Sequence, residues 1–197
     1  NGTLEGSLTV RWSDGLALEG ALRARGFAPA AISPDWEGVL NGELSGSLRR
    51  RADGPVRGEV EARLRQSSLH GQSLSGEVAA AFGEGDLQVR RLLLRGKGFV
   101  VTAAGRLGER LAFAAEAGDL GRVIPGAAGQ LGADGGVRRQ AGRLAGALSG
   151  QGTRLAVAGL RVGGVQVSAR LGDGKEPPVH VAAFFRDAAY GGLHIDS

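Results

Sequence analysis

The chain has 197 residues and a formal net charge of +4, and 42% of its residues are hydrophobic. It contains 36 glycines, no cysteine and no methionine. This length suits one large β domain or two small ones, and the lack of cysteine excludes disulfides, thiolate metal sites and cysteine nucleophiles. Because the chain has no methionine, we expect it to be a segment of a longer protein, with any membrane anchor outside it.

Small or apolar residues alternate with polar ones along most of the chain, which indicates strands with one dry face and one wet face. In residues 56–65 every even position is small or apolar and every odd position is charged. Turn-forming residues separate such runs at 13–15, 52–55, 83–86, 96–98 and 172–174. We therefore predict an all-β fold, an antiparallel meander with strands of about eight residues. The runs with this period are 4–12, 16–25, 40–49, 56–65, 74–82, 99–107, 144–150, 155–159, 165–171 and 179–185.

Two kinds of irregularity interrupt the alternation. At residues 89–94 it slips by one position, which predicts a β-bulge or a strand break. Residues 27–34 and 119–125 can each form a short helical turn, closed by Pro34 and Pro125 respectively.

The two helical turns belong to an approximate internal repeat, with one copy at about residues 16–107 and the other at about residues 108–197. A repeat of this size predicts one elongated, strongly curved sheet that is extended by adding strands. Three glycines of the first copy, Gly26, Gly38 and Gly58, correspond to Gly118, Gly129 and Gly146 of the second.

Several glycines lie in phase with the apolar positions, where a sandwich core usually carries bulky residues. One interpretation is tight packing of sheet on sheet, with glycine at the bends. The other is a trough lined by leucine and valine, in which a lipid tail would gain about 0.8 kcal/mol per buried CH₂. These glycines are Gly42, Gly46, Gly58, Gly76, Gly105, Gly146 and Gly150.

The second interpretation gives a set of candidate residues that would face such a groove. They are the large apolar residues of the dry face, and we predict that they contact lipid: Leu40, Leu44, Leu48, Val56, Val60, Leu64, Val78, Phe82, Phe99, Val101, Leu111, Phe113, Leu144, Leu148, Val165, Val167, Val181 and Phe185.

We expect no enzymatic activity, no metal and no cofactor. His70, His180 and His194 are scattered without the spacing of metal ligands. Acidic residues alternate with arginine, which argues against a desolvated carboxylate pair. The glycine-rich segments 83–85 and 132–136 do not join a strand to a long helix, as a phosphate loop requires.

Basic residues do not predict nucleic-acid binding, since no aromatic residues are interleaved with them on a shared face. The densest basic cluster is residues 49–51, three consecutive arginines. It could touch anionic lipid headgroups, although a solvated strand end is the simpler interpretation.

The segment Leu40-Asn41-Gly42-Glu43-Leu44-Ser45-Gly46-Ser47-Leu48 resembles the repeats of TamB and the wider AsmA-like family. So do residues 118–125, followed by Gly129-Gln130-Leu131. These are large proteins of the Gram-negative envelope, and the resemblance covers nearly the whole chain. It implies a taco-shaped β-sheet with a hydrophobic interior.

The resemblance also implies a location and partners. The family is anchored in the inner membrane, spans the periplasm and is tied to phospholipid movement towards the outer membrane. We therefore expect a periplasmic segment whose groove carries phospholipid acyl chains between the two membranes. The alternative is a structural scaffold that assists outer-membrane protein assembly with an Omp85-type partner. An isolated segment would also expose two sheet edges that can pair with a second copy.

Overall fold

The computed structural model describes residues 2–13, 15–34, 36–69, 71–122, 124, 126–140, 142–172, 179–190 and 193–195. These residues form two compact units. The first consists of residues 1–97 and 104–106, and the second of residues 98–103 and 107–197. All regular structure in the described residues is β-strand apart from two 3₁₀ turns, so the all-β prediction is confirmed.

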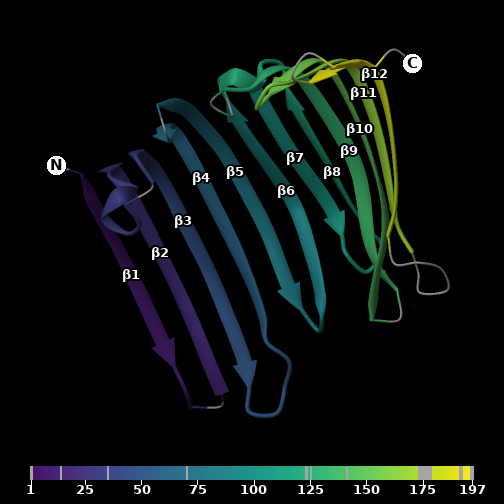
Figure 1. The fold of residues 1–197 in the computed structure, drawn as a ribbon. Coiled ribbons are helices and arrows are strands. Elements are labelled where there is room, and N and C mark those ends of the chain that lie inside the picture. The colour runs from purple at the N-terminus through teal and green to yellow at the C-terminus, as the bar shows by residue number, and fades with distance from the viewer. Residues whose placement is uncertain are drawn as a thin grey trace. The chain divides into compact units, whose positions relative to one another are not determined.

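The first unit contains six antiparallel strands that follow one another in chain order (Figure 1). A 3₁₀ turn, η1 (Pro29–Ala31), connects the second and third strands. The next strand, β7 (Phe99–Arg106), is divided between the two units. The six strands are β1 (Thr3–Arg11), β2 (Gly15–Phe27), β3 (Gly38–Arg51), β4 (Arg57–Leu69), β5 (Gln72–Gly83) and β6 (Asp86–Gly96).

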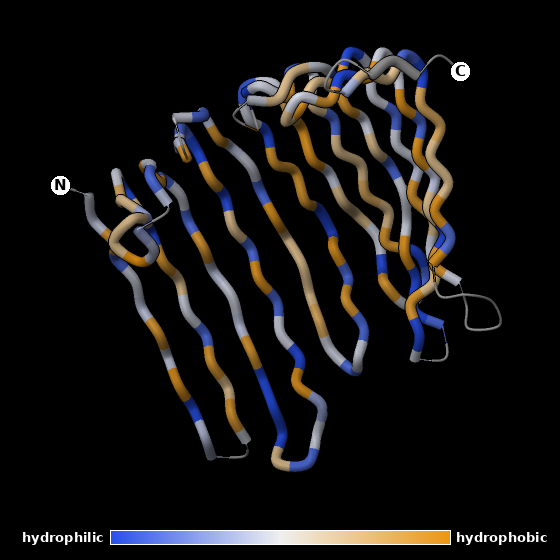
Figure 2. The backbone as a smooth tube through the Cα atoms, in the orientation of Figure 1, coloured by the Kyte–Doolittle hydropathy of each residue, from blue (hydrophilic) through white to orange (hydrophobic). Residues whose placement is uncertain are grey.

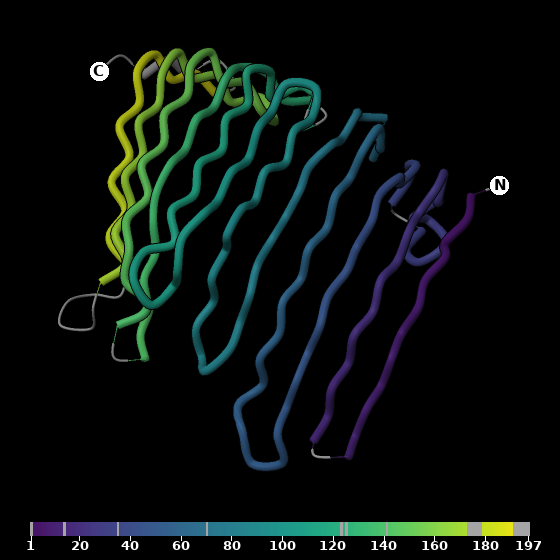
Figure 3. The backbone as a smooth tube through the Cα atoms, turned by 180° about the vertical axis from the view of Figure 1, so that it is seen from behind, coloured from purple at the N-terminus to yellow at the C-terminus, as the bar shows by residue number. Residues whose placement is uncertain are grey.

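The second unit repeats this arrangement, again with antiparallel neighbours in chain order, as the view from behind also shows (Figure 3). A second 3₁₀ turn, η2 (Leu120–Arg122), connects its first two complete strands. The strands are β8 (Arg110–Ala117), β9 (Ala128–Gln140), β10 (Arg143–Val157), β11 (Leu160–Leu171), β12 (Val179–Tyr190) and β13 (Leu193–Ile195).

Both predicted helical turns are confirmed, as η1 and η2. The slip at residues 89–94 is confirmed as a bulge, because β6 pairs Arg91 with Ala79 but Val89 with Ala80, which leaves Arg90 as the extra residue. The closing role of Pro125 and part of the turn at 172–174 lie outside the described residues.

The prediction of strands of about eight residues is wrong for most of the sheet. Residues 144–150 and 155–159, expected as two strands, belong to the single 15-residue strand β10. A bulge explains the difference, since the pairing of β10 with β9 shifts between Thr153 and Ala156, and Arg154 has a φ of 51°. A bulge absorbs a change of phase without ending the strand.

A row of bulges also crosses β2 to β5 in the first unit, and Asn41 connects its members. The Asn41 side-chain oxygen accepts a hydrogen bond from the Gly26 amide at 2.7 Å, and its amide donates to the Gln66 carbonyl at 2.9 Å. The buried Ser67 hydroxyl donates to the Asn41 carbonyl at 3.0 Å and accepts from the Asn41 amide at 2.9 Å. One residue therefore satisfies irregular backbone groups on both flanking strands.

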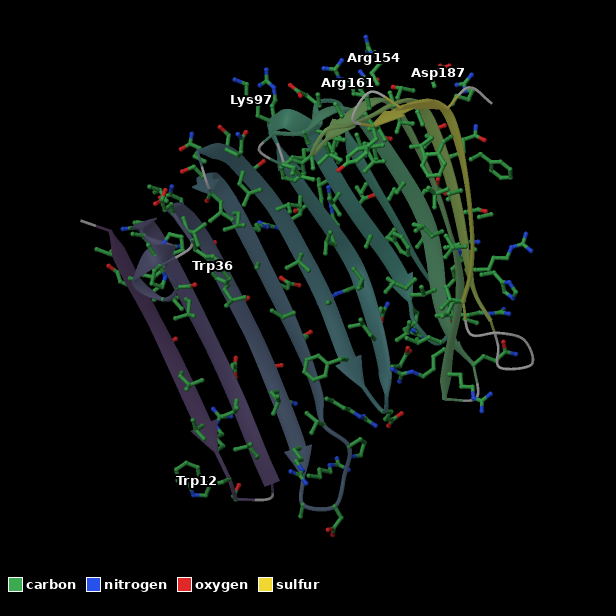
Figure 4. All side chains as sticks on the ribbon, viewed as in Figure 1. Trp12, Trp36, Lys97, Arg154, Arg161 and Asp187 are labelled. Atoms are coloured by element: carbon green, nitrogen blue, oxygen red, sulfur yellow. The ribbon has the colours of Figure 1, made fainter. Side chains whose placement is uncertain are left out.

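Each unit has one layer of sheet and a small core. The buried hydrophobic residues of the described chain are Ala80, Val89, Leu107, Ala145 and Val162. Trp12 and Trp36 are exposed at opposite ends of the strands of the first unit (Figure 4). Nothing helical in the described ranges has the length and apolar character needed to cross a bilayer.

Replacing Asn41 with alanine removes the hydrogen bonds of its side chain to β2 and β4. We expect the free energy of local opening at Gly26 to fall by about 1 kcal/mol, the usual net contribution of such a bond. Hydrogen exchange of the full-length protein, followed by mass spectrometry, should show faster exchange in peptides covering Gly26. Ser45→Ala on the same strand is the control, and equal exchange in the two variants would contradict the role of Asn41.

Candidate functional site

In the first unit the strand register gathers the apolar side chains on one side of the sheet. Directly paired residues of neighbouring strands point to the same face, so each row of partners across the strands can be read from the pairing. We call this side the apolar face of the first unit. Its rows are Leu4, Ala24, Gly42, Leu64, Gly76, Leu94; Gly6, Leu22, Leu44, Ala62, Val78, Leu92; Leu8, Gly20, Gly46, Val60, Ala80, Val89; and Val10, Leu18, Leu48, Gly58, Phe82, Leu87.

The second unit has an apolar face of the same kind. The alternation of hydrophobic and hydrophilic residues that produces these faces is visible along the strands (Figure 2). The rows of the second unit are Ala117, Leu131, Gly152, Val165, Phe185; Ala115, Ala133, Gly150, Val167, Ala183; Phe113, Gly135, Leu148, Ala169, Val181; and Leu111, Val137, Gly146, Leu171, Val179.

Most of the predicted groove residues lie in these rows, as two sets, one in each unit. Leu40 extends the first set through its pairing with Phe27, and Leu144 extends the second through its pairing with Arg139. Val56 precedes β4 and lies outside a strand, while Phe99 and Val101 belong to the divided strand β7. Whether these residues contact lipid stays a prediction.

The prediction omitted several residues of the same faces. They follow the alternation that identified the others, apart from Leu87 and Val89, whose phase is hidden by the bulge at Arg90. The omitted large residues of the listed rows are Leu4, Leu8, Val10, Leu18, Leu22, Leu87, Val89, Leu92, Leu94, Leu131, Val137, Leu171 and Val179.

Many side chains of both apolar faces are open to solvent. In the first unit the exposed fraction is 70% for Leu8 and 50% for Leu4, and in the second it is 65% for Val181 and 50% for Phe185. Exposed apolar residues become informative when they form a contiguous patch, since such patches mark binding surfaces. The register makes both sets contiguous.

The glycines of the apolar faces do not generally leave empty space. A Cβ built on Gly58 would lie 2.6 Å from Phe82 Cζ, and one on Gly76 would lie 3.1 Å from Leu94 Cδ1. A large side chain of the next strand therefore covers the glycine. The space beside the glycine is filled by a side chain of the neighbouring strand at four of the positions singled out in the sequence: Gly42, Gly58, Gly76 and Gly146.

Gly46 and Gly150 differ from these four. A Cβ on Gly150 would meet only the Gly132 carbonyl oxygen at 3.5 Å and Ala133 Cβ at 3.9 Å. For Gly46 the nearest atoms are backbone atoms of β4. Both glycines lie in the row of their unit that carries the smallest side chains, so the surface is lower there than in the two adjacent rows.

The opposite side of each sheet is mainly polar, although Phe184, which pairs with Gln166, is 71% exposed there. In the first unit one row across β1 to β5 alternates in charge, and its Arg23 and Glu43 form an ion pair of 2.6 Å. Arg90 reaches Glu61 at 3.2 Å and Glu59 at 3.6 Å. These exposed pairs each contribute about 0.2–1 kcal/mol and favour the observed register. The alternating row is Glu5, Arg23, Glu43, Arg63 and Glu77.

Hollows between side chains are also present on the polar side. In the second unit one of about 450 Å³ is lined by Glu116, Asp134, Gln151 and their neighbours. Its lining mixes carboxylates, amides and hydroxyls with Ala114, Val167 and Phe184, so a hydrocarbon chain there would desolvate polar groups, which it would not do on the apolar face. The described residues contain no cluster of three or more His, Asp and Glu side chains able to hold a metal ion.

Two glycines of the second unit allow a matched test of the packing. Gly135→Ala would place its Cβ 2.5 Å from the Ala147 carbonyl oxygen and 2.8 Å from Phe113 Cζ, and we expect a loss of about 1–3 kcal/mol in the free energy of unfolding. Gly150→Ala meets only ordinary contacts, so we expect no loss and a gain of up to about 1 kcal/mol. Chemical denaturation of the two variants measures the difference, and equal stability would show that Phe113 moves away at no cost.

Comparison with known proteins gives one positive result. The family model described as TamB, N-terminal domain, matches residues 1–197, which is the whole chain. Searches of curated proteins and of solved structures each found no match. The antiparallel strands in chain order and the apolar face of each unit agree with the β-sheet that the family resemblance implies. The chain therefore belongs to the TamB family of envelope proteins.

Proposed function

We propose that this chain is a non-enzymatic lipid-binding segment whose apolar faces carry the acyl chains of phospholipids between the inner and outer membranes. The observation that carries the proposal is the uncovered apolar face, which occurs in each of the two units. Membership of the TamB family supports a periplasmic location for this segment.

The chemistry of the apolar face fits a hydrocarbon ligand. Its rows carry leucine, valine, alanine, glycine and phenylalanine, without a hydrogen-bonding side chain in any of the rows given above. The backbone donors and acceptors behind them are used in the strand ladders. Burial of a lipid tail on this surface gains about 0.8 kcal/mol per CH₂ from the hydrophobic effect.

Such binding would also permit movement. The hydrophobic effect is non-directional and scales with the apolar area removed from water. A tail that shifts over these rows therefore exchanges one set of apolar contacts for another and breaks no hydrogen bond. A surface of this kind suits a carrier that must release its ligand.

The alternative function is a scaffold in outer-membrane protein assembly, with an Omp85-type partner. In that case another protein layer would cover the apolar face, and lipid would not occupy it. Photo-crosslinking from positions on the apolar face distinguishes the two functions, because it identifies whether lipid or protein lies against that face.

A photo-crosslinking amino acid placed in the full-length protein tests lipid contact at adjacent positions of one strand. Leu44 lies on the apolar face and Glu43 on the polar side of β3. We expect lipid adducts from position 44 but not from position 43, and in the second unit from position 167 but not from 166. Mass spectrometry identifies the adducts. Equal lipid labelling from both positions of a pair, or protein adducts alone from 44 and 167, would contradict the proposal.

A charge on the apolar face should impair transfer more than folding. Val60→Asp places a carboxylate beside Gly46 and Ala80, where it repels hydrocarbon but keeps some contact with water because Val60 is only partly buried. Ser75→Asp is the control, since Ser75 lies on the polar side opposite Arg95. We expect a loss of phospholipid transfer of at least about ten-fold for Val60→Asp alone, with similar thermal unfolding for both variants. Full transfer by Val60→Asp would contradict lipid passage over this row.

A further inference from the structure

In each unit an arginine continues the apolar face at the end of a strand, next to the last of the rows given above. In β3, Arg50 follows Leu48 by two positions and pairs with Leu16. In β9, Arg139 follows Val137 by two positions and pairs with Leu144. Residues two apart on a strand, and directly paired residues, share a face. Both guanidinium groups therefore project from the dry side of the sheet.

The surroundings of the two arginines are alike. Leu48 pairs with Gly58, and Val137 pairs with Gly146, so each arginine adjoins a row in which a glycine faces an aliphatic residue. The paired leucines are partly exposed, Leu16 to 39% and Leu144 to 47%. The same combination of an exposed aliphatic side chain and a guanidinium thus arises separately in two units.

The neighbouring arginines point the other way. Arg49 pairs with Ala17 and Arg57, and Arg138 pairs with Ala145, all on the polar side. In the described part of the chain neither Arg50 nor Arg139 forms an ion pair, whereas Arg23 and Arg57 are paired with glutamates. The basic strand ends are therefore divided between the two faces, and only one arginine of each borders the apolar rows.

We propose that Arg50 and Arg139 bind the phosphate of a phospholipid whose acyl chains lie on the adjoining apolar face, and that they favour anionic headgroups. This inference rests on the proposed lipid-binding function. A guanidinium offers a planar pair of donors that matches phosphate oxygens. At the edge of an apolar face the guanidinium also lies at the level where the acyl chains of a bound lipid end and its headgroup begins.

The dimensions of the face agree with this placement. The stretch from Leu40 to Leu48 in β3 spans about 26 Å at the usual rise of a strand. Half of a bilayer core is about 15 Å thick, so a tail extending from Arg50 along the strand finds apolar surface over its whole length. In the first unit Trp12 follows the end of β1 and is 77% exposed. It lies at the same end of the unit as Arg50, because Arg11 pairs with Ala17 and Ala17 pairs with Arg49. Tryptophan favours the headgroup level of lipid.

The test compares two double variants of the full-length protein. Arg50→Gln with Arg139→Gln removes the arginines of the apolar face. Arg49→Gln with Arg138→Gln removes the same charge from the same strands on the polar side. Co-purified phospholipids are quantified by headgroup using mass spectrometry, and flotation with vesicles of phosphatidylcholine with or without phosphatidylglycerol measures contact with a bilayer surface. Thermal unfolding of both variants shows whether they fold equally.

We expect the first double variant to lower the ratio of anionic to zwitterionic lipid by about five-fold while total lipid falls little, since tail burial supplies most of the binding. The second should leave the ratio unchanged. An unchanged ratio in the first variant, or an equal fall in both, would overturn the inference while the proposed function stands. So would a loss of flotation with an unchanged ratio, because the arginines would then serve a bilayer surface. Absence of lipid from the unmodified protein would overturn the proposed function itself.

Discussion

A single layer of β-sheet leaves one apolar face that its own strands cannot cover, and the other features of this chain follow from that constraint. Domains usually bury such a face against a second layer. Here each unit has one layer, and its few buried residues include Ala80 and Val162. Stability must therefore come mainly from the backbone ladders, the cross-strand pairs and whatever covers the face. The proposed ligand would therefore cover the apolar surface that the fold itself leaves exposed.

The many glycines suggest a face with empty space, but most of those on the apolar faces are covered by a neighbouring strand. On the apolar faces Phe82 lies over Gly58 and Phe113 over Gly135, so a large side chain of one strand fills the space beside its neighbour. The neighbouring strand's carbonyl oxygens also come close to several of these glycines, which leaves little room for a Cβ. These glycines therefore leave no pits, and the surface is lower only in the row of Gly46 and in that of Gly150. A hydrocarbon chain then finds apolar contacts in many positions, which favours carriage over tight storage.

The alternation in residues 56–65 was enough to predict β4 and its two faces, and the same alternation elsewhere in the chain gave the other predicted apolar residues, because a period of two is a local signal. The bulge at Arg90 was also local. The bulge at Arg154 was not predictable, since a non-glycine residue with positive φ has no distinctive sequence. The hydrogen bonds of Asn41 and the cover of Gly58 by Phe82 depend on register between strands, which no single segment contains. The predicted strand lengths were wrong for the same reason, since the pairing with neighbouring strands decides where a strand ends.

The two directions of the sheet have different chemistry within each unit. Each apolar row runs across the strands without a polar side chain, so a tail that lies along one strand meets no specific contact that would hold it on that strand. Along the strands the surface ends at an arginine, Arg50 or Arg139, whose hydrogen bonds are directional. A lipid oriented by its phosphate at the strand end would keep that orientation while its tails remain free to shift along the rows, from one strand to the next. Anchoring of the headgroup and mobility of the tails are thus compatible in one layer of sheet, because they act along perpendicular axes.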